Sequence, residues 1–544
     1  MAAPICQLDV RMEDLRRLVD RTRETALTED EHRTLKAAID TLGYVADLLE
    51  QKGTSLANLR QLLFGATTEK TRHVLAQAGI DPTKTTATTD APAEPGEARP
   101  RPRAPGHGRH GADAYVGGQR VAVPHATLHH GDRCPECAKG KLYMQREPRL
   151  LIRLVGQAPI RATVYALETL RCNLCGEVFT ADPPPGVGRE KYDATAGAMI
   201  ALLKYGTGLP FNRLAGLQAA VQIPLPASTQ WEIVRDLATE LQPVLVELTE
   251  QAAQGELLQN DDTSMTVLSL GSARADPAAD GVSPERTGVF TSAVVSTRAG
   301  QRIALFLTGR RHAGENLAQV LRARAADLGP PIQMCDALSR NLPKPLSVIL
   351  ANCLAHARRH VVNVTPNFPE ECRYILESLG EVYHHDAEAR DRQLSPAERL
   401  AWHQAHSGPV MAQLEAWLKA QLDEHRVEPN SGLGKAIRYF LRHWTELTLF
   451  LRQPGAPLDN TLTERTLKKA ILHRKNALFF RTTNGAHVGD LFMSLIHTCE
   501  LAGVNAFDYL TRLQQHAHAM RENPSAWMPW NYRETLAKIE PAHA

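Results

Sequence analysis

The first part of the chain has the hydrophobic pattern of a long helix. Leucines recur at every seventh position, at Leu35, Leu42, Leu49, Leu56 and Leu63. Thr28 and Glu31 form a capping-box pattern just before this repeat. The repeat predicts a leucine-zipper-like helix that oligomerises. Gly53 and Arg60 interrupt the second position of the seam, so a helical hairpin that buries the same leucines is an equal alternative for residues 1–75.

The next stretch, residues 76–125, has no such pattern. Between 83 and 113 the chain consists mainly of Thr, Ala, Pro, Gly and Arg, which cannot bury a core. The sequence therefore predicts a flexible linker. Its basic residues could lie along phosphates or belong to a simple soluble tether; they are Arg99, Arg101, Arg103 and Arg109.

Two strand-like runs follow within residues 126–185. Residues 149–155 and 162–170 are rich in Leu, Ile, Val and Tyr, with Gly156 and Pro159 between them. A Cys-x-x-Cys pair lies on each side of this predicted hairpin, which gives Cys134, Cys137, Cys172 and Cys175. Four thiolates from two tight turns suit one structural zinc ion, so the pattern predicts a zinc ribbon. Two disulfides or four thiols are the alternatives, but nothing indicates an oxidising compartment.

Residues 190–250 read as three helices. The first two cover 194–205 and 211–220, and a turn containing Pro224 and Pro226 follows. We expect Ser228 or Thr229 to cap the third helix, the latter in a capping box with Glu232. A short helix, a turn and a capped helix are compatible with a helix-turn-helix.

From residue 255 to 350 the pattern changes to strands. The order of predicted elements is strand, strand, strand, helix, strand, over 257–268, 287–297, 302–308, 312–328 and 331–335. This order is that of a ribonuclease H-like fold, in which the first and fourth strands lie side by side. Asp261 on the first strand and Asp336 after the fourth should then meet at one end of the sheet.

A third acid stands on a predicted helix near residues 457–476. Glu464 is in its first turn and is followed by the cations Arg465, Lys468, Lys469, Arg474 and Lys475. An acid among so many cations suggests metal and phosphate chemistry. Three carboxylates can hold two magnesium or manganese ions about 4 Å apart.

Each acid also has a plain structural interpretation. Glu464 could close a capping box with Thr461. Asp262 could replace Asp261 as the ligand, because the two lie on opposite faces of one strand. Asp336 could simply cap a turn. Three acids at the expected places of one topology make these interpretations less probable together than singly.

The residues between the second and third acids, 351–455, are predicted to form a helical insertion. We expect helices over 396–405, 410–426 and 433–451, the first capped by Ser395 and Glu398.

This insertion begins with the segment Cys353-Leu-Ala-His-Ala-Arg-Arg-His360. His356 and His360 share a helix face and could bind a metal. Ala357 occupies the position of the metalloprotease glutamate, which argues against that class. We interpret the segment as a packed Cys and His beside Arg358 and Arg359, which face phosphate.

The length of 544 residues leaves room for three to five domains, and the overall class predicted is multidomain α+β. Residues 456–525 complete the catalytic core and 526–544 form a tail. The net charge of +2 does not itself indicate nucleic-acid binding, so local basic clusters must supply it. The first residues lack the layout of a signal peptide, and no apolar run reaches the length of a membrane span, so we expect a cytoplasmic, nucleoid-associated protein.

Several motifs together resemble a transposase of the insertion-sequence-66 family, over nearly the whole chain. They are Leu62-Leu-Phe-Gly65 with Glu69-Lys70, the paired Cys-x-x-Cys, Cys353-Leu-Ala-His-Ala-Arg-Arg359, Asp459-Asn460, Glu464-Arg465, Arg474-Lys-Asn476, Phe479 and a helix over 489–501. The resemblance implies an Asp-Asp-Glu triad, which motif matching assigns to Asp261, Asp336 and Glu464.

The implied chemistry is metal-dependent cleavage at transposon ends, which releases 3′-hydroxyls, followed by strand transfer into target DNA. The resemblance further implies an oligomer and two small accessory proteins. We expect Arg358, Arg359, Arg465, Lys468, Arg474 and Lys475 to contact DNA. A nuclease of the same fold that cuts without joining is an alternative.

Two motifs depart from the family pattern. Asn260-Asp-Asp-Thr263 stands where Ala-Asp-Glu-Thr is usual, and Asp336-Ala-Leu338 where Asp-Gly-Tyr is usual. The acids remain while their neighbours differ, which leaves open an inactive copy that acts as a DNA-binding protein.

Overall fold

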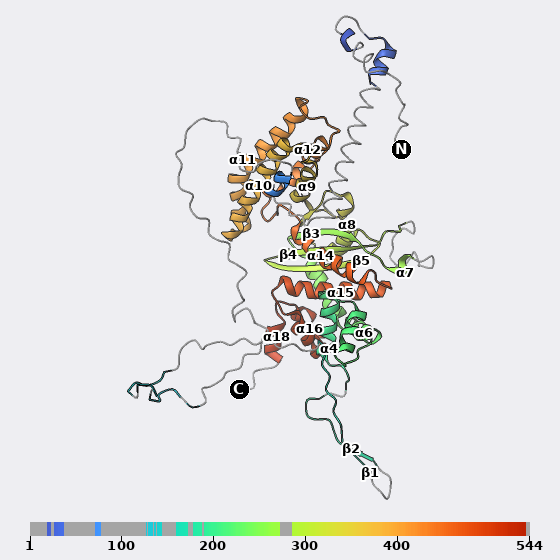
Figure 1. Ribbon diagram of the computed structural model, residues 1–544, viewed down its shortest axis with the longest axis vertical. Helices are drawn as coiled ribbons and strands as arrows, with labels where there is room; N and C mark the ends of the chain where they lie inside the picture. Colours follow the sequence, from blue (N-terminus) through green and yellow to red (C-terminus); the bar gives the residue numbers. More distant parts are fainter. Residues whose placement is uncertain are drawn as a thin grey trace. The chain divides into compact units, whose positions relative to one another are not determined.

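The computed structural model describes residues 19–22, 27–36, 71–77, 127, 129–133, 135–137, 139–143, 159–171, 178–187, 190–271 and 286–539 (Figure 1). The chain divides into two compact units. One comprises Thr86–Arg161, and the other comprises Met1–Thr85 together with Ala162–Ala544.

A five-stranded mixed sheet lies in the larger unit. Its order is β5-β4-β3-β6-β7, where β3 is Leu257–Ser264, β4 Phe290–Arg298, β5 Gln301–Gly309, β6 Ile332–Cys335 and β7 Ile349–Asn352. The first three strands pair antiparallel, whereas β3, β6 and β7 pair parallel. The expected adjacency of the first and fourth strands is confirmed, since Leu257 lies opposite Ile332.

Two predictions for this sheet were wrong. β3 ends at Ser264 rather than at residue 268, and Leu268 is instead the first residue of the short helix α7 (Leu268–Gly271). Strand β7 was not predicted, and it occupies the residues where the helical insertion was expected to begin. Its two first residues are only half-buried, and four residues are too few for a clear alternation of polar and apolar positions.

Helices α8 (Ala313–Leu321), α14 (Thr461–Ala477) and α15 (Thr483–Leu501) pack on this sheet. Figure 1 shows α14 and α15 next to the sheet, although a long insertion separates them from it in sequence. α8 ends seven residues earlier than predicted. α14 lies against β3 and β4, and α15 lies along the edge strand β5. These contacts bring the first turn of α14 to the strands that carry the acids.

Side chains of α15 cap the free edge of β5. Backbone N–H groups of Ala304, Phe306 and Thr308 donate to Thr498 Oγ1, Ser494 Oγ and Asp490 Oδ2, at 3.1, 2.9 and 2.6 Å. Four helical residues rise about 6 Å and two strand residues about 6.7 Å, so one side chain per turn meets every second strand residue. The edge is thereby closed to pairing with another strand.

Helices also precede the sheet, as the sequence predicts. They are α4 (Ala194–Ala201) with the π-turn η2 (Leu202–Gly206), α5 (Phe211–Ala220) and α6 (Ala227–Ala253). The expected cap of the third helix is wrong. α6 begins at Ala227, with Pro226 as its N-cap, so Ser228 and Thr229 lie inside the helix. The buried amide of Gln230 instead ties the helix start to the carbonyls of Phe211 and Leu225, at 3.1 and 2.9 Å.

The insertion is helical and has its own core. It contains α9 (Leu354–Val364), α10 (Pro369–Asp391), α11 (Pro396–Asp423), α12 (Gly432–Arg442), α13 (Trp444–Leu447) and η4 (Leu449–Leu451). The Ser395–Glu398 capping box is confirmed. The two predicted helices over 396–426 are one helix that contains Pro409, and the predicted helix over 433–451 breaks at His443.

Two terminal segments pack where the sequence did not place them. α3 (Thr71–Gln77) contacts α10, and Leu75 is 2% exposed within the core of the insertion. The expected tail forms η5 (Pro524–Trp527) and α18 (Tyr532–Ile539), after α16 (Ala506–Gln515) and α17 (Ala517–Glu522). Trp527 is buried there, and its carbonyl accepts a hydrogen bond from Tyr509 at 2.8 Å.

The Thr28–Glu31 capping box is confirmed, by backbone N–H bonds of 2.9 and 3.4 Å. The leucines of the predicted heptads beyond Leu35, and the linker from residue 78 to 126, lie outside the described residues. Among the helices that the structure describes, none is long and apolar enough to span a bilayer.

The segments around the two cysteine pairs form short hairpins. Arg133 and Lys141 bridge antiparallel around Cys137, and the N–H of Gly140 donates to its Sγ at 3.4 Å. Separately, β1 (Thr169–Arg171) pairs with β2 (Val178–Thr180), on either side of the second pair. The predicted strand over 162–170 is therefore a strand only at its end, and its partner follows the cysteines. Residues 149–155 and Cys134, Cys172 and Cys175 lie outside the described residues, so the zinc ribbon stays a prediction.

Candidate active site

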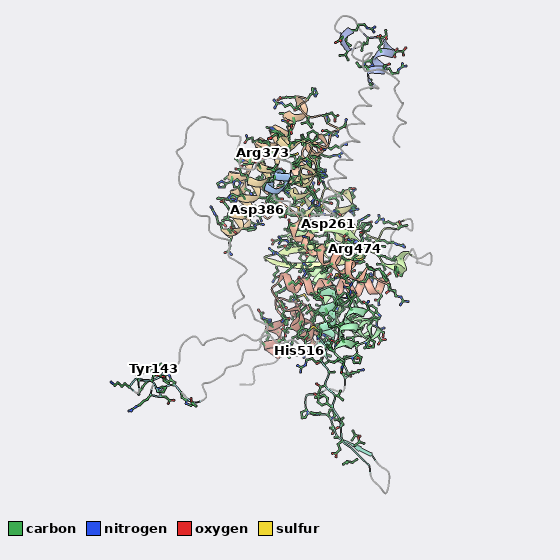
Figure 2. All side chains as sticks on the ribbon, in the orientation of Figure 1. Tyr143, Asp261, Arg373, Asp386, Arg474 and His516 are labelled. Carbon is green, nitrogen blue, oxygen red and sulfur yellow. The ribbon has the colours of Figure 1, made fainter. Side chains whose placement is uncertain are left out.

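The first predicted acid, Asp261, is the fifth of the eight residues of β3, the central strand of the sheet, and lies just beyond the residues that pair with β6 (Figure 2). Asp336 follows β6 directly, and β6 is the parallel neighbour of β3. Burial, together with the negative charges of Asp336, Asp262 and Glu464, raises the pKa of Asp261 to about 7. Asp336 and Glu464 therefore lie close enough to Asp261 to act electrostatically on its carboxyl group.

Asp262 has a different role from its neighbour. Its Oδ2 lies 3.0 Å from His312 Nδ1 and accepts the N–H of Ala313 at 3.3 Å, and its Oδ1 pairs with Arg340 at 3.3 Å. These contacts cap the start of α8 on the other side of the strand. Asp261 is accordingly the better candidate for a shared site with the other acids.

Asp336 does cap a turn, as its structural interpretation proposed. Its Oδ1 accepts the N–H of Leu338 at 3.2 Å and a hydrogen bond from the side-chain amide of Asn341. Both donors approach the same oxygen, so these bonds orient the carboxylate at the end of β6.

Glu464 lies in the first turn of α14, but it closes no capping box with Thr461. The helix begins at Thr461, with Asn460 as its N-cap, and Asn460 O accepts the N–H of Glu464 at 3.1 Å. The side chain lies beside two residues of α9 instead, with Oε1 3.6 Å from His356 Nδ1 and Oε2 3.9 Å from Arg359. Oε1 and His356 Nδ1 are buried, and within the described residues neither finds a hydrogen-bond partner.

A buried network of amides lies behind the three acids. Asn460 Nδ2 donates to the carbonyl of Asn260 at 3.1 Å, and Asn260 Nδ2 donates to the carbonyl of Asn341 at 2.8 Å. Gln333 donates both to Asn260 Oδ1 and to the Asn341 carbonyl, at 2.8 and 2.7 Å. The network ties β3, β6, the turn after β6 and the start of α14 together. Each acid is thus anchored through a neighbouring amide.

This network explains the unusual residue before the first acid. Asn260 is fully buried and both ends of its side-chain amide are bonded, which an alanine could not achieve. Sequence reasoning missed these amides. A polar residue inside an apolar strand, at Asn260 and again at Gln333, was the available signal.

Cys353 and His356 lie beside Glu464 rather than beside His360. One ligand atom each from Cys353, His356 and Glu464 lies within 4.8 Å of the others. The ring of His360 packs against Tyr439 instead, 4.5 Å between centroids. Burial raises the pKa of the Cys353 thiol to about 12. Cys353 and His356 are thus packed next to each other, as the sequence interpretation preferred, and Glu464 rather than His360 is the third potential ligand.

The predicted DNA-binding residues fall into two groups. Arg465, Lys468 and Lys475 are exposed on α14. The others have contacts within the protein: Arg474 with Thr263 and Ser264 at 3.2 and 2.8 Å, Arg358 with Thr71 at 3.2 Å, and Arg359 with Glu464. The second group orients elements around the acids as well as carrying charge.

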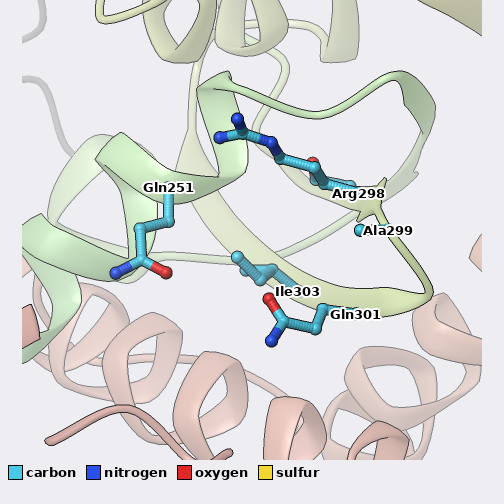
Figure 3. A pocket seen from close by; sticks show the side chains of 6 residues that line it. Gln251, Arg298, Ala299, Gln301 and Ile303 are labelled. Atoms are coloured by element: carbon cyan, nitrogen blue, oxygen red, sulfur yellow. The ribbon is translucent and has the colours of Figure 1, made fainter. Parts of the chain in front are cut away.

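A cavity of about 220 Å³ lies elsewhere on the sheet, at the turn between β4 and β5 (Figure 3). Gln251, Arg298 and Gln301 line it together with Ser296, Ala299 and Ile303. Ser296 pairs with Leu258 near the start of β3, whereas Asp261 pairs with Ala293. The cavity is therefore displaced from the acids along the strands and is no part of their site.

The model of the Transposase IS66 family matches residues 190–488, more than half of the 544 residues. An uncharacterized protein of Sinorhizobium fredii (strain NBRC 101917 / NGR234), y4jD, is 27% identical over 504 residues, which cover 88% of this chain and 94% of the relative. A second from the same organism, y4qI, is 28% identical over 357 residues, 62% of each chain. A third, y4hP, is 24% identical over 403 residues, 68% of this chain and 69% of the relative.

Proposed function

The chain belongs to the IS66 family of transposases, and from this premise we propose that Asp261, Asp336 and Glu464 are its catalytic Asp-Asp-Glu triad. The proposed reaction is cleavage of DNA at transposon ends, followed by transfer of the released 3′-hydroxyl to target DNA. The observation that carries the proposal is the shared electrostatic environment of the three acids, which come from β3, the end of β6 and α14.

The arrangement of strands supports the proposal. Three antiparallel strands followed by a parallel fourth and fifth, in the order β5-β4-β3-β6-β7, form the order expected of the ribonuclease H-like core that we propose. In such a core the acids of the first and fourth strands adjoin. The amide network through Asn260 and Asn460 gives these acids a rigid support, as a phosphoryl-transfer site requires.

The donor set fits hard divalent cations. The three acids supply only oxygen ligands, and the pKa of Asp261 is raised by burial first and then by the neighbouring acids, whose negative charge a cation would neutralise. Two magnesium or manganese ions, when bound, would activate the attacking oxygen and stabilise the leaving oxygen. We assign their binding to Asp261, Asp336 and Glu464.

The remaining residues would bind and orient DNA. Arg465, Lys468 and Lys475 are exposed on the helix of Glu464, so they could pair with phosphates beside the cleaved bond. Arg359 pairs with Glu464, and its guanidinium group could bind both that carboxylate and a phosphate.

Other regions would contribute to DNA recognition and assembly. We propose α5 and α6 as a helix-turn-helix-like module, and the two Cys-x-x-Cys pairs as a zinc ribbon. A family member that joins two ends would act as an oligomer, and two small accessory proteins would be its partners. These assignments rest on the family and on the sequence patterns.

The test is cleavage of a labelled duplex that carries the element's own end, with magnesium or manganese, and with the accessory proteins supplied. Glu464→Gln and Asp336→Asn should abolish nicking while leaving DNA binding measurable. Strand-transfer products would distinguish a transposase from a nuclease. Binding without nicking by the unaltered protein would reject the catalytic assignment and favour a DNA-binding protein derived from a transposase.

A further inference from the structure

We propose that Cys353, His356 and Glu464 form a binding site for a thiophilic divalent cation, of which zinc is the representative. The site differs from the proposed magnesium site in its donors, since it adds a sulfur and an imidazole nitrogen to one carboxylate. It shares Glu464 with that site. Cation binding here does not depend on the proposed catalysis and can be measured without DNA.

The geometry is close to that of a three-ligand site. The three ligand atoms lie within 4.8 Å of one another, and His356 Nδ1 is 3.6 Å from Glu464 Oε1. Bond lengths near 2.0 Å to nitrogen and oxygen and near 2.3 Å to sulfur place tetrahedral ligands roughly 3.3–3.5 Å apart. A contraction of at most about 1.5 Å, by side-chain rotation, would close the shell.

Two of the three ligand atoms have no hydrogen-bond partner within the described residues. His356 Nδ1 and Glu464 Oε1 are buried, and among the described residues they have no hydrogen-bond partner although they face each other. A buried polar atom without a partner costs about 1–3 kcal/mol, so such atoms in pairs point to a missing ligand. A cation between them would satisfy both.

The backbone holds the cysteine in place. Cys353 is the N-cap of α9, so His356 three residues later lies on the same side of the helix start. The N–H of Asn460 donates to Cys353 Sγ at 3.2 Å, and the N–H of Leu354 donates to the carbonyl of Leu458 at 3.0 Å. The start of α9 and the segment that enters α14 are thus already joined around the sulfur.

The donor types decide the class of cation. Thiolate and imidazole favour zinc or cobalt over magnesium, which prefers oxygen alone. On binding, the cation forms a bond to sulfur and the thiol proton of Cys353 passes to solvent. The bound cation would link α9 of the insertion to α14 and would engage Oε1 of the third acid.

The experiment uses cobalt(II) as the probe with the full chain, in the absence of DNA and magnesium. The predicted ribbon would also bind cobalt, so Cys134→Ser with Cys172→Ser provides the background. This protein should still show the near-ultraviolet absorption of one sulfur–cobalt bond per chain, to which cobalt held by carboxylates alone does not contribute. Adding Cys353→Ser, His356→Gln or Glu464→Gln should weaken cobalt binding at least tenfold, and Cys353→Ser should also remove the sulfur absorption.

Cys372→Ser is the matched control. Cys372 is another buried thiol, on α10, and its Sγ lies 3.6 Å from the carbonyl of Val361. Its replacement should leave the cobalt signal unchanged. His356 and Glu464 have partly exposed side chains, so His356→Gln and Glu464→Gln keep the test valid if Cys353→Ser unfolds. Absence of sulfur–cobalt absorption in the background protein, or its full survival in His356→Gln and Glu464→Gln, would overturn the proposal.

Discussion

The side-chain amide of Asn460 donates a hydrogen bond of 3.1 Å to the backbone carbonyl of Asn260, across 200 residues of sequence. Asn260 precedes the first acid and Asn460 precedes the helix of the third, so this one contact sets the position of Glu464 relative to Asp261. Its surroundings exclude water, because both residues are fully buried.

Replacing Asn460 by alanine should therefore affect both folding and the site. The change removes the donor to the Asn260 carbonyl and one of the two acceptors of the Gln259 amide, the other being the carbonyl of Asp459. We expect a loss of about 1–3 kcal/mol in the free energy of unfolding, measured by urea denaturation. Asn430→Ala is the matched control, since Asn430 is exposed and bonds only the nearby side chain of Glu428 among the contacts described. Equal stability of the two variants would contradict the role of the network.

The sequence predicted the order of strands but not the network that joins them. Alternation of apolar residues identified β3, β4, β5 and β6, and their order implied that β3 and β6 adjoin. Periodicity carries no information about which buried amide bonds which carbonyl, because those partners are set by tertiary packing. Asn260 and Asn341 could be linked only by the fold.

The same limit applies to the candidate site. The three acids could be chosen from topology and family motif, and Asp261 could not be separated from Asp262 by sequence alone. The separation comes from α8, whose first residues bond Asp262. Likewise, helical spacing allowed His360 as a ligand beside His356, but only the fold brings Glu464 of α14 to Cys353 and His356.

Neutralising Asp261 and neutralising Asp262 should have opposite effects on the stability of the protein. The pKa of Asp261 is raised to about 7, first by burial and then by the nearby acids. A carboxyl whose pKa is raised on folding stabilises the protein below its unfolded pKa, near 4, and this contribution is lost as the pH rises through 7. In metal-free protein at pH 8, Asp261→Asn should therefore have a higher free energy of unfolding than the unaltered protein, by at most about 4 kcal/mol, and should melt at a higher temperature.

The control is Asp262→Asn, one residue away. Asp262 pairs with Arg340 and His312, so its neutralisation should lower stability by roughly 1–3 kcal/mol. Thermal unfolding of both variants between pH 4 and pH 8, without metal, makes the comparison. An Asp261→Asn protein that gains nothing at pH 8 would contradict the raised pKa of Asp261.

Asp490 should give a second pH-dependent effect, far from the acids. Burial raises its pKa to about 7, more than the two hydrogen bonds from Thr308 lower it. The stability it contributes is present below about pH 4 and is lost as the pH rises through 7. Asparagine can accept the Thr308 N–H and donate to its hydroxyl, so Asp490→Asn should flatten the decline in unfolding free energy between pH 5 and pH 8.

Asp490→Ala provides the comparison for that variant. It removes the pH-dependent group as well but leaves the Thr308 N–H at the sheet edge without its acceptor. We expect it to be about 1–3 kcal/mol less stable than Asp490→Asn at every pH. Parallel pH profiles of the Asn variant and the unaltered protein would contradict the assignment.

The exposed cations of α14 should contribute to DNA affinity through phosphates. Lys468 and Lys475 lie on the exposed surface of the helix that carries Glu464, so their positive charge borders the proposed cleavage site. Each phosphate contact releases counterions, so Lys468→Ala or Lys475→Ala should lower the slope of log affinity against log salt by about 0.9. The loss should be similar for end and unrelated sequences, because phosphates carry no sequence information. Lys419→Ala is the control, since Lys419 pairs with Glu415 on α11 at 2.8 Å. Titrations of labelled duplex at several salt concentrations measure the slopes, and identical slopes for all three variants and the unaltered protein would place the DNA elsewhere.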